Sequence, residues 1–178
     1  GLRNPNFLPL LRKIRKNNPK IEFKTDFSFV LGSNDKYLMQ RYIKGKFYVS
    51  GSILNNVLSG QSIINGRIYS NGRLFLVNPT GILTGPHSAI KAEGAILSTL
   101  NLSKQNYLDN NLQFNTNSNS SLVNQGLIEG QYVALISPQV NNKGNIITSA
   151  ATTIVAGDDV LLGISDSNNL TVKVSPSK

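Results

Sequence analysis

The stretch NGRLFLVNPTGILTGPHSAIKAEGAILSTLNLS, residues 71–103, decides the fold of this chain. It opens with Asn71-Gly72, a pair that readily adopts the positive φ of a tight turn. A short β-rich run, Arg73–Val77, comes next. Asn78-Pro79-Thr80-Gly81 then places Asn, Pro and Gly at positions i, i+1 and i+3 of a type I turn. The pattern indicates short strands separated by sharp turns, without a long helical run.

Ile82-Leu83 restarts the apolar pattern, and beyond His87 every second residue is again apolar or small. The alternating positions are Ile90, Ala92, Ile96, Ser98, Leu100 and Leu102. A period of two predicts strands with one buried face. Short strands of this kind, joined by turns, predict a chain that coils one rung onto the next.

A repeat of about 18 residues follows in the C-terminal half. The recurring pairs are Gly126 and Gly144, Ile128 and Ile146, and Ile136 and Ile154. A unit of this length with strands and no helix is too short for a propeller blade and suits one coil of a β-helix. We predict that both isoleucine pairs point inward and stack on adjacent rungs, so that an aspartate at Ile146 costs about 3 kcal/mol or more. Asn124 and Asn141 are predicted to form an amide ladder at a turn.

Three segments stand apart from this repeat. Residues 21–30 alternate apolar and polar side chains and predict an amphipathic strand. Residues 107–121 are rich in Asn and Ser and predict an excursion or long loop outside the main body. At the end of the chain, the alternation over residues 170–174 predicts that Leu170, Val172 and Val174 point inward.

The composition fits a single folded domain of 178 residues without disulfides or thiolate zinc sites, because the chain has no cysteine. No apolar run approaches the ~18 residues that a transmembrane helix needs. The apolar run Leu8–Leu11 is too short for a signal peptide. The net charge is +9, and basic residues crowd the first 24 positions. Such an arm suits nucleic acid or an anionic membrane, but we favour a solvated or locally docked segment.

Catalytic patterns are absent from the sequence. Asp158 and Asp159 are adjacent, so on a strand they would point to opposite faces instead of sharing a cleft. The only histidine, His87, lies in a Gly-Pro-His-Ser turn that predicts a surface position. No G-x-S-x-G, phosphate-binding or dinucleotide-binding motif occurs. We therefore predict no catalytic residue, no cofactor and no metal site, and a protein that is not an enzyme.

An ordered set of motifs resembles the two-partner secretion domain, the haemagglutination activity domain of filamentous-haemagglutinin-type exoproteins in Gram-negative bacteria. The matching segments are Ile53–Val57, Ser62–Gly66, Asn71-Gly72, Phe75–Ile82 and Ser98–Ser103. They correspond to an L-N-x-V strand, S-x-I-x-G, A-N-G, a strand ending in N-P-N-G-I, and S-T-L-N-L-S. Thr80 stands where the family has the second Asn of N-P-N-G-I. The good match covers about residues 47–174.

The resemblance implies an all-β, right-handed parallel β-helix with extra-helical strands. It implies two parts: a divergent basic N-terminal segment or cap at residues 1–45, and the β-helix at residues 46–178. The residues that it implies for partner recognition or for the structure of the motif are Leu54, Asn55, Val57, Asn78, Pro79, Thr80, Gly81 and Ile82. For the N-P-T-G-I turn, we expect the Asn78 side chain to bond nearby backbone and Gly81 to lie where a Cβ is unwelcome.

The resemblance further implies a secretion-targeting domain at the head of a large exported adhesin or haemolysin. Its expected partner is a dedicated outer-membrane β-barrel transporter that recognises it through periplasmic domains. The domain would be a monomer, secreted or placed on the cell surface after passing through the periplasm. A host cell surface is a further partner that the resemblance allows, whereas nucleic acid is not expected.

The alternative is a β-helical adhesin or carbohydrate-binding module without a secretion role. A sugar-binding surface of this kind would need aromatic side chains in an exposed row. Tyr69, Phe75 and Tyr132 are its candidates. A polysaccharide-processing enzyme would instead need carboxylates gathered in one cleft.

Overall fold

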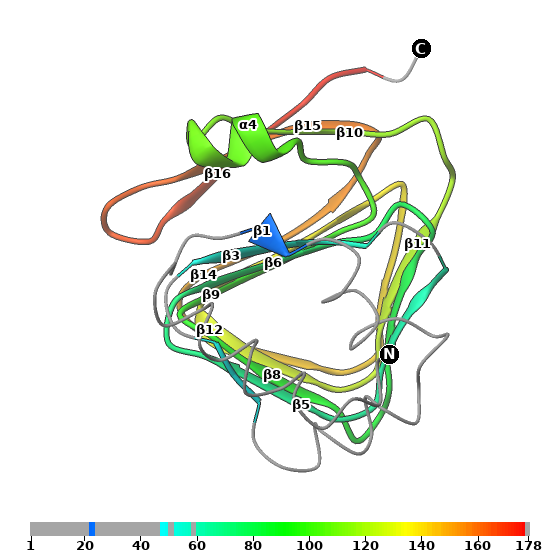
Figure 1. Cartoon of the computed structure of the whole chain (residues 1–178), viewed down its shortest axis with the longest axis vertical. Coiled ribbons are helices and arrows are strands. Elements are labelled where there is room, and N and C mark those ends of the chain that lie inside the picture. Colours follow the sequence, from blue (N-terminus) through cyan, green and yellow to red (C-terminus); the bar gives the residue numbers. More distant parts are fainter. Residues whose placement is uncertain (1–21, 24–46, 50–51, 58–59, 177–178) are drawn as a thin grey trace.

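The predicted rungs coil into a parallel β-solenoid of about 5 turns, which confirms the fold class (Figure 1). The computed structural model describes residues 22–23, 47–49, 52–57 and 60–176. Viewed along the solenoid axis, the coils have a triangular outline, in which a nine-stranded sheet extends over two sides and a four-stranded sheet forms the third. The predicted basic arm, the predicted strand beyond Phe23 and the division at residue 45 lie largely outside the described residues.

Each side of the triangle is built from strands that pair in parallel with the coils above and below. One side holds β2 (Phe47–Val49), β5 (Arg67–Ser70), β8 (Ala89–Lys91) and the first halves of β12 (Leu127–Ser137) and β14 (Asn145–Ala156). The second side holds β1 (Glu22–Phe23), β3 (Ile53–Asn56), β6 (Arg73–Val77), β9 (Gly94–Ser98) and the second halves of β12 and β14. The third side holds β4 (Ser62–Ile64), β7 (Ile82–Thr84), β11 (Ser121–Asn124) and β13 (Gln139–Asn142).

Columns of identical or similar side chains fill the inside of the solenoid. In-register pairing places Ile68, Ile90, Ile128 and Ile146 one above another on successive coils. A second column on the next side runs through Leu76, Leu97 and Leu135. Because neighbouring strands in a sheet lie about 4.8 Å apart, like side chains stacked at that spacing fill the interior without gaps.

A second hydrophobic core lies on the outside of the solenoid, over the β3–β6–β9–β12 side. It is covered by α4 (Lys104–Leu108) and by an antiparallel sheet of β10 (Leu112–Asn115), β15 (Asp159–Ile164) and β16 (Leu170–Val174) (Figure 1). Both faces of β6 and β9 are therefore buried, and the prediction of one buried face is wrong for these strands. Ile96 belongs to this outer core, whereas Ile90 belongs to the inner one.

The predicted stacking of isoleucines is half right. Ile128 is in register with Ile146, as the repeat predicts. Ile154 instead pairs with Leu135, and Ile136 pairs with Val155, because the register shifts between Gly130 and Tyr132. Ile154 is also 49% exposed on β14, a strand that pairs with a neighbouring coil only through β12 among the described residues. The prediction that Ile154 is buried under Ile136 is therefore wrong. The prediction that Ile136 points inward is wrong as well, since Ile136 belongs to the outer core.

The asparagine ladder exists with a different member. Asn124 is in register with Asn142, not Asn141, and its side-chain Nδ2 donates a hydrogen bond of 2.9 Å to Asn142 Oδ1. The Asn124 Oδ1 accepts a further bond from the hydroxyl of Thr84 on the coil below. The pairing keeps the 18-residue spacing of the repeat through this strand, so Asn142 and not Asn141 is the counterpart of Asn124.

The excursion at residues 107–121 lies outside the solenoid as predicted, since it supplies the end of α4 and all of β10. The prediction for the end of the chain is wrong. Residues 170–174 form β16 in the extra-helical sheet, where Val172 and Val174 are 36% and 47% exposed instead of pointing into the solenoid.

Candidate functional site

The N-P-T-G-I motif forms the corner between β6 and β7. The backbone N–H of Thr80 donates to Asn78 Oδ1 at 2.9 Å, and the N–H of Gly81 donates to the Asn78 carbonyl at 3.1 Å. The side chain and the main chain of Asn78 therefore each close one loop of the turn. This is the local backbone bonding that the sequence predicts for Asn78.

The same asparagine ties three successive coils together. Its Nδ2 donates to the Gly60 carbonyl and to Ser62 Oγ, each at 2.8 Å, on the preceding coil. Its backbone N–H donates to the Ser98 carbonyl of the following coil at 2.9 Å. Asn78 is fully buried, and these bonds take the place of hydrogen bonds to water that its amide loses on folding.

Gly81 and Thr80 meet different demands in this turn. Gly81 has a φ of +133°, which disfavours any residue with a side chain, and a Cβ there would lie 3.4 Å from the Ser121 carbonyl oxygen. Thr80 is exposed, and the turn uses its backbone N–H. Because no bond in the turn depends on its side chain, threonine is compatible with a position where the family has asparagine.

Asn78→Ala is expected to lower the free energy of unfolding by about 2–4 kcal/mol, since it leaves several buried groups without partners. Gly81→Val is expected to cost about 1–3 kcal/mol through backbone strain. Thr80→Ala is the matched control and should stay within about 0.5 kcal/mol of the parent. Urea unfolding of the purified variants measures all three. A parent-like midpoint for Asn78→Ala would show that these bonds do not hold the corner.

The remaining motif residues are buried in the solenoid as well. Leu54 belongs to the outer core, and Val57 and Ile82 belong to the inner core. Asn55, which follows Leu54 in β3, is also 0% exposed. Pro79 is half-buried, and its carbonyl accepts hydrogen bonds from the hydroxyls of Ser118 and Ser120. Of the eight motif residues, Thr80 alone is well exposed in the folded domain.

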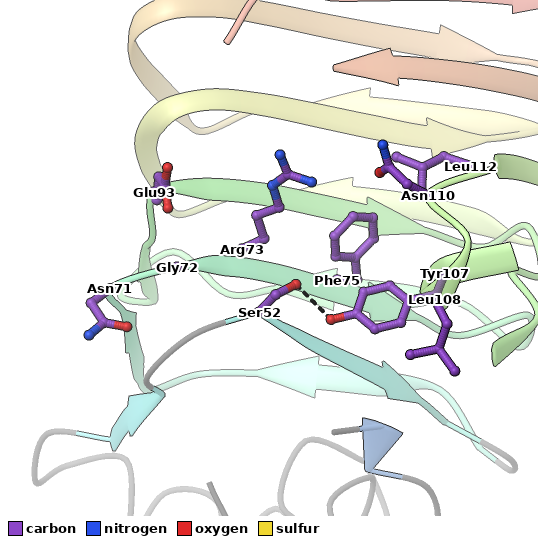
Figure 2. A pocket seen from close by; sticks show the side chains of 10 residues that line it. All are labelled: Ser52, Asn71, Gly72, Arg73, Phe75, Glu93, Tyr107, Leu108, Asn110 and Leu112. Carbon is purple, nitrogen blue, oxygen red and sulfur yellow. Dashed lines mark hydrogen bonds between the residues drawn. The ribbon is translucent and has the colours of Figure 1, made fainter. Parts of the chain in front are cut away.

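A cavity of about 740 Å³ lies on the outer side of the solenoid, between β6 and α4 (Figure 2). Phe75 and Tyr107 meet edge to face in its wall, with ring centroids 5.3 Å apart, and the Tyr107 hydroxyl bonds Ser52 Oγ at 2.6 Å. Arg73 and Glu93 bring opposite charges to the other end. The described lining residues therefore carry no net charge for an ionic ligand, and Phe75, at 1% exposure, presents no ring face for sugar stacking.

The three candidate aromatic residues do not form the exposed row that the carbohydrate-binding alternative requires. Tyr132 is fully buried, with its ring above Gly94, where a Cβ would lie 2.0 Å from it. Burial raises the pKa of the Tyr132 hydroxyl, while the nearby Arg73 guanidinium favours the ionised form. That hydroxyl has no hydrogen-bond partner of good geometry among the described residues. Tyr69 is half-buried.

Other side chains considered from the sequence do not gather into a reactive site. His87 is exposed in its turn, as predicted. Asp158 and Asp159 are half-buried, and Asp159 accepts a hydrogen bond from Gln113. Within the described residues, no three His, Cys, Asp or Glu side chains lie close enough to hold a metal ion. Residues 60–176 carry six Lys or Arg and six Asp or Glu, so the positive charge of the chain lies outside this region.

Sequence reasoning missed two features that support the motif. Ser103 caps α4, its Oγ accepting from the Asn106 N–H at 3.0 Å, and this helix brings Tyr107 against Phe75. Serine is a typical residue at a helix N-cap, so Ser103 was the sequence feature from which α4 could have been predicted. The second feature is the pair of serine hydroxyls on Pro79, which a low-complexity Asn/Ser segment does not reveal because the contact spans about 40 residues.

The described part of the chain contains no helix with the length and apolar character needed to cross a membrane. Comparison with known proteins points to secretion. No curated protein sequence matches. Among solved structures, the secretion domain of HMW1 from Haemophilus influenzae is similar, with 28% identity and a TM-score of 0.60. The similarity covers 75% of this chain and 41% of that one.

A family model described as the TPS secretion domain matches residues 16–177, nearly the whole chain and part of the predicted N-terminal segment. The motifs, the solenoid, the extra-helical strands and this match agree. The chain therefore belongs to the TPS secretion domain family, the secretion domains of two-partner systems.

Proposed function

We propose that this domain targets its protein to a dedicated outer-membrane transporter, whose periplasmic domains recognise the chain before the solenoid closes. The exported protein would pass through the periplasm and fold outside the cell. Family membership supports the secretion role. Burial of the motif supports recognition before folding, because Leu54, Asn55, Asn78 and Ile82 are all 0% exposed in the folded domain.

A folded domain would hide these side chains from any partner. If the motif is read, it is therefore read in an extended chain, where strand residues are free to pair with an edge of a partner sheet. A solenoid suits this order, because its coils fold by contact with their neighbours and closure can proceed along the axis. Burial of the motif then ends the interaction with the transporter.

The test measures binding of the chain to the cognate transporter's periplasmic domains immediately after dilution from urea. Asn78→Ala combined with Gly81→Ala is expected to weaken binding about tenfold or more, a loss of about 1.4 kcal/mol. Removal of residues 1–20 is expected to preserve binding at moderate salt, because attraction by the basic arm is screened over about 8–10 Å. The folded domain is expected to bind more weakly than the freshly diluted chain.

Gly126→Ala is the matched control, since it disturbs folding away from the motif. A Cβ at Gly126 would lie 2.6 Å from the carbonyl oxygens of both Gly85 and Ser88. If the transporter reads the extended motif, this variant binds as well as the parent. Equal loss of binding in both variants would mean that the transporter needs the folded domain. Loss of binding with the basic arm alone would refute recognition through the motif.

A further inference from the structure

Asn55 occupies a position in the solenoid that every other described coil gives to an apolar residue. Its in-register neighbours on successive coils are Leu76, Leu97, Leu135 and Ile154. Along β3 it lies between Ile53 and Val57, both part of the inner core. Among the described residues, Asn55 is thus the polar member of an otherwise apolar column, with Phe23 of β1 in register on its N-terminal side.

The amide of Asn55 is buried without compensation. The side chain is 0% exposed, and neither Nδ2 nor Oδ1 has a hydrogen-bond partner among the described residues. The other buried asparagines behave differently, because Asn78 and Asn124 bond the coils next to them. When β3 packs onto β6, the Asn55 amide therefore loses its hydrogen bonds to water and gains none from the described residues.

Leucine has the same number and branching of side-chain heavy atoms as asparagine and would continue the column. The residue at this position therefore lowers stability at one place, the coil that carries the L-N-x-V strand. In a solenoid, where each coil is held by its neighbours, a local penalty in one coil makes that coil the last to close and the first to open.

We propose that Asn55 is a folding brake, a buried polar residue that keeps β3 open while the chain is being exported. This role rests on the proposed function, since an open β3 matters only if the chain is read before it folds. The brake holds the first motif strand accessible while coils with complete aliphatic columns close. Export then ends with β3 packing onto β6 outside the cell.

Asn55→Leu in the full chain tests the brake. We expect the purified variant to melt about 5 °C or more above the parent, with slower amide exchange in β3 and faster refolding from urea. Secretion through the cognate transporter is expected to fall at least about threefold. Tyr132→Phe is the matched control: it removes the other unpartnered buried group, on a later coil, and is expected to stabilise the domain without reducing secretion.

The parent is first shown to require the transporter, since transporter-independent secretion would overturn the proposed function and the brake with it. Three results would overturn the brake alone. A lower melting temperature for Asn55→Leu would mean that the amide has a partner. Higher stability with undiminished secretion would mean that an open β3 is not needed. Reduced secretion with unchanged stability and exchange would mean that the transporter reads the Asn55 side chain itself.

Discussion

Replacing Ile128 with aspartate is expected to unfold the domain under conditions in which the parent is stable. Ile128 is 0% exposed and lies between Ile90 and Ile146 in the column inside the solenoid. Among the described residues no Lys or Arg is buried, so a carboxylate there is unpaired. The cost is about 4 kcal/mol or more, close to the lower end of the 5–15 kcal/mol that stabilises a typical domain.

Circular dichroism and urea unfolding of purified Ile128→Asp check this result. Ile146→Asp is the control, because Ile146 is only partly buried on β14. From the sequence we expect about 3 kcal/mol or more for that substitution, but partial exposure lowers the expected cost to about 1–2 kcal/mol. Equal effects of the two substitutions would mean that the column is not more tightly packed at its centre.

Gly126→Ala is expected to be a severely damaging substitution although it adds only a single methyl group. The added Cβ would lie 2.2 Å from Ser88 Oγ and 2.6 Å from the carbonyl oxygens of Ser88 and Gly85. Two of these three contacts are with backbone, so a change of rotamer cannot relieve them. The coils must separate locally, at a cost of about 3 kcal/mol or more.

Gly157→Ala is the comparison that isolates this effect. Its Cβ would meet only the side chains of Val174 and Val160, at 3.0 and 3.6 Å, and side chains can adjust. We expect a cost of about 1 kcal/mol or less. Thermal unfolding compares the two variants, and we expect the lower melting temperature for Gly126→Ala. Similar melting temperatures would show that the coils are not in contact at Gly126 in solution.

Much of the solenoid is predictable from the sequence because its spacing repeats. Turn residues at Asn71-Gly72 and Asn78–Gly81 mark the corners, and the 18-residue spacing places Ile128 on Ile146. The same spacing fails beyond Gly130, where β14 holds one more residue than β12. The extra residue falls within a run of Ser, Ala and Thr, a composition equally suited to strand and bulge, so no pattern reveals it.

The outer core is not predictable in the same way. β10 pairs with β15, whose residues lie about 45 positions later, and β16 joins them in antiparallel order. Alternation marks these segments as strands but does not identify their partners. Contacts between distant segments were not predictable at the motif either, although Asn78 and Gly81 were correctly predicted as turn residues. That Asn78 also reaches Gly60 and Ser62 on the preceding coil could be read only from the structure.

The outer core also determines how the domain responds to mechanical force. A bare solenoid peels from its end, each coil tearing away while the rest holds. Here one hydrophobic cluster joins Leu54 on β3, Ile96 on β9 and Val155 on β14 to the covering strand β15. A pull on the end of the chain is therefore shared among coils that are not adjacent, and the domain resists as a block until the β10–β15–β16 layer detaches.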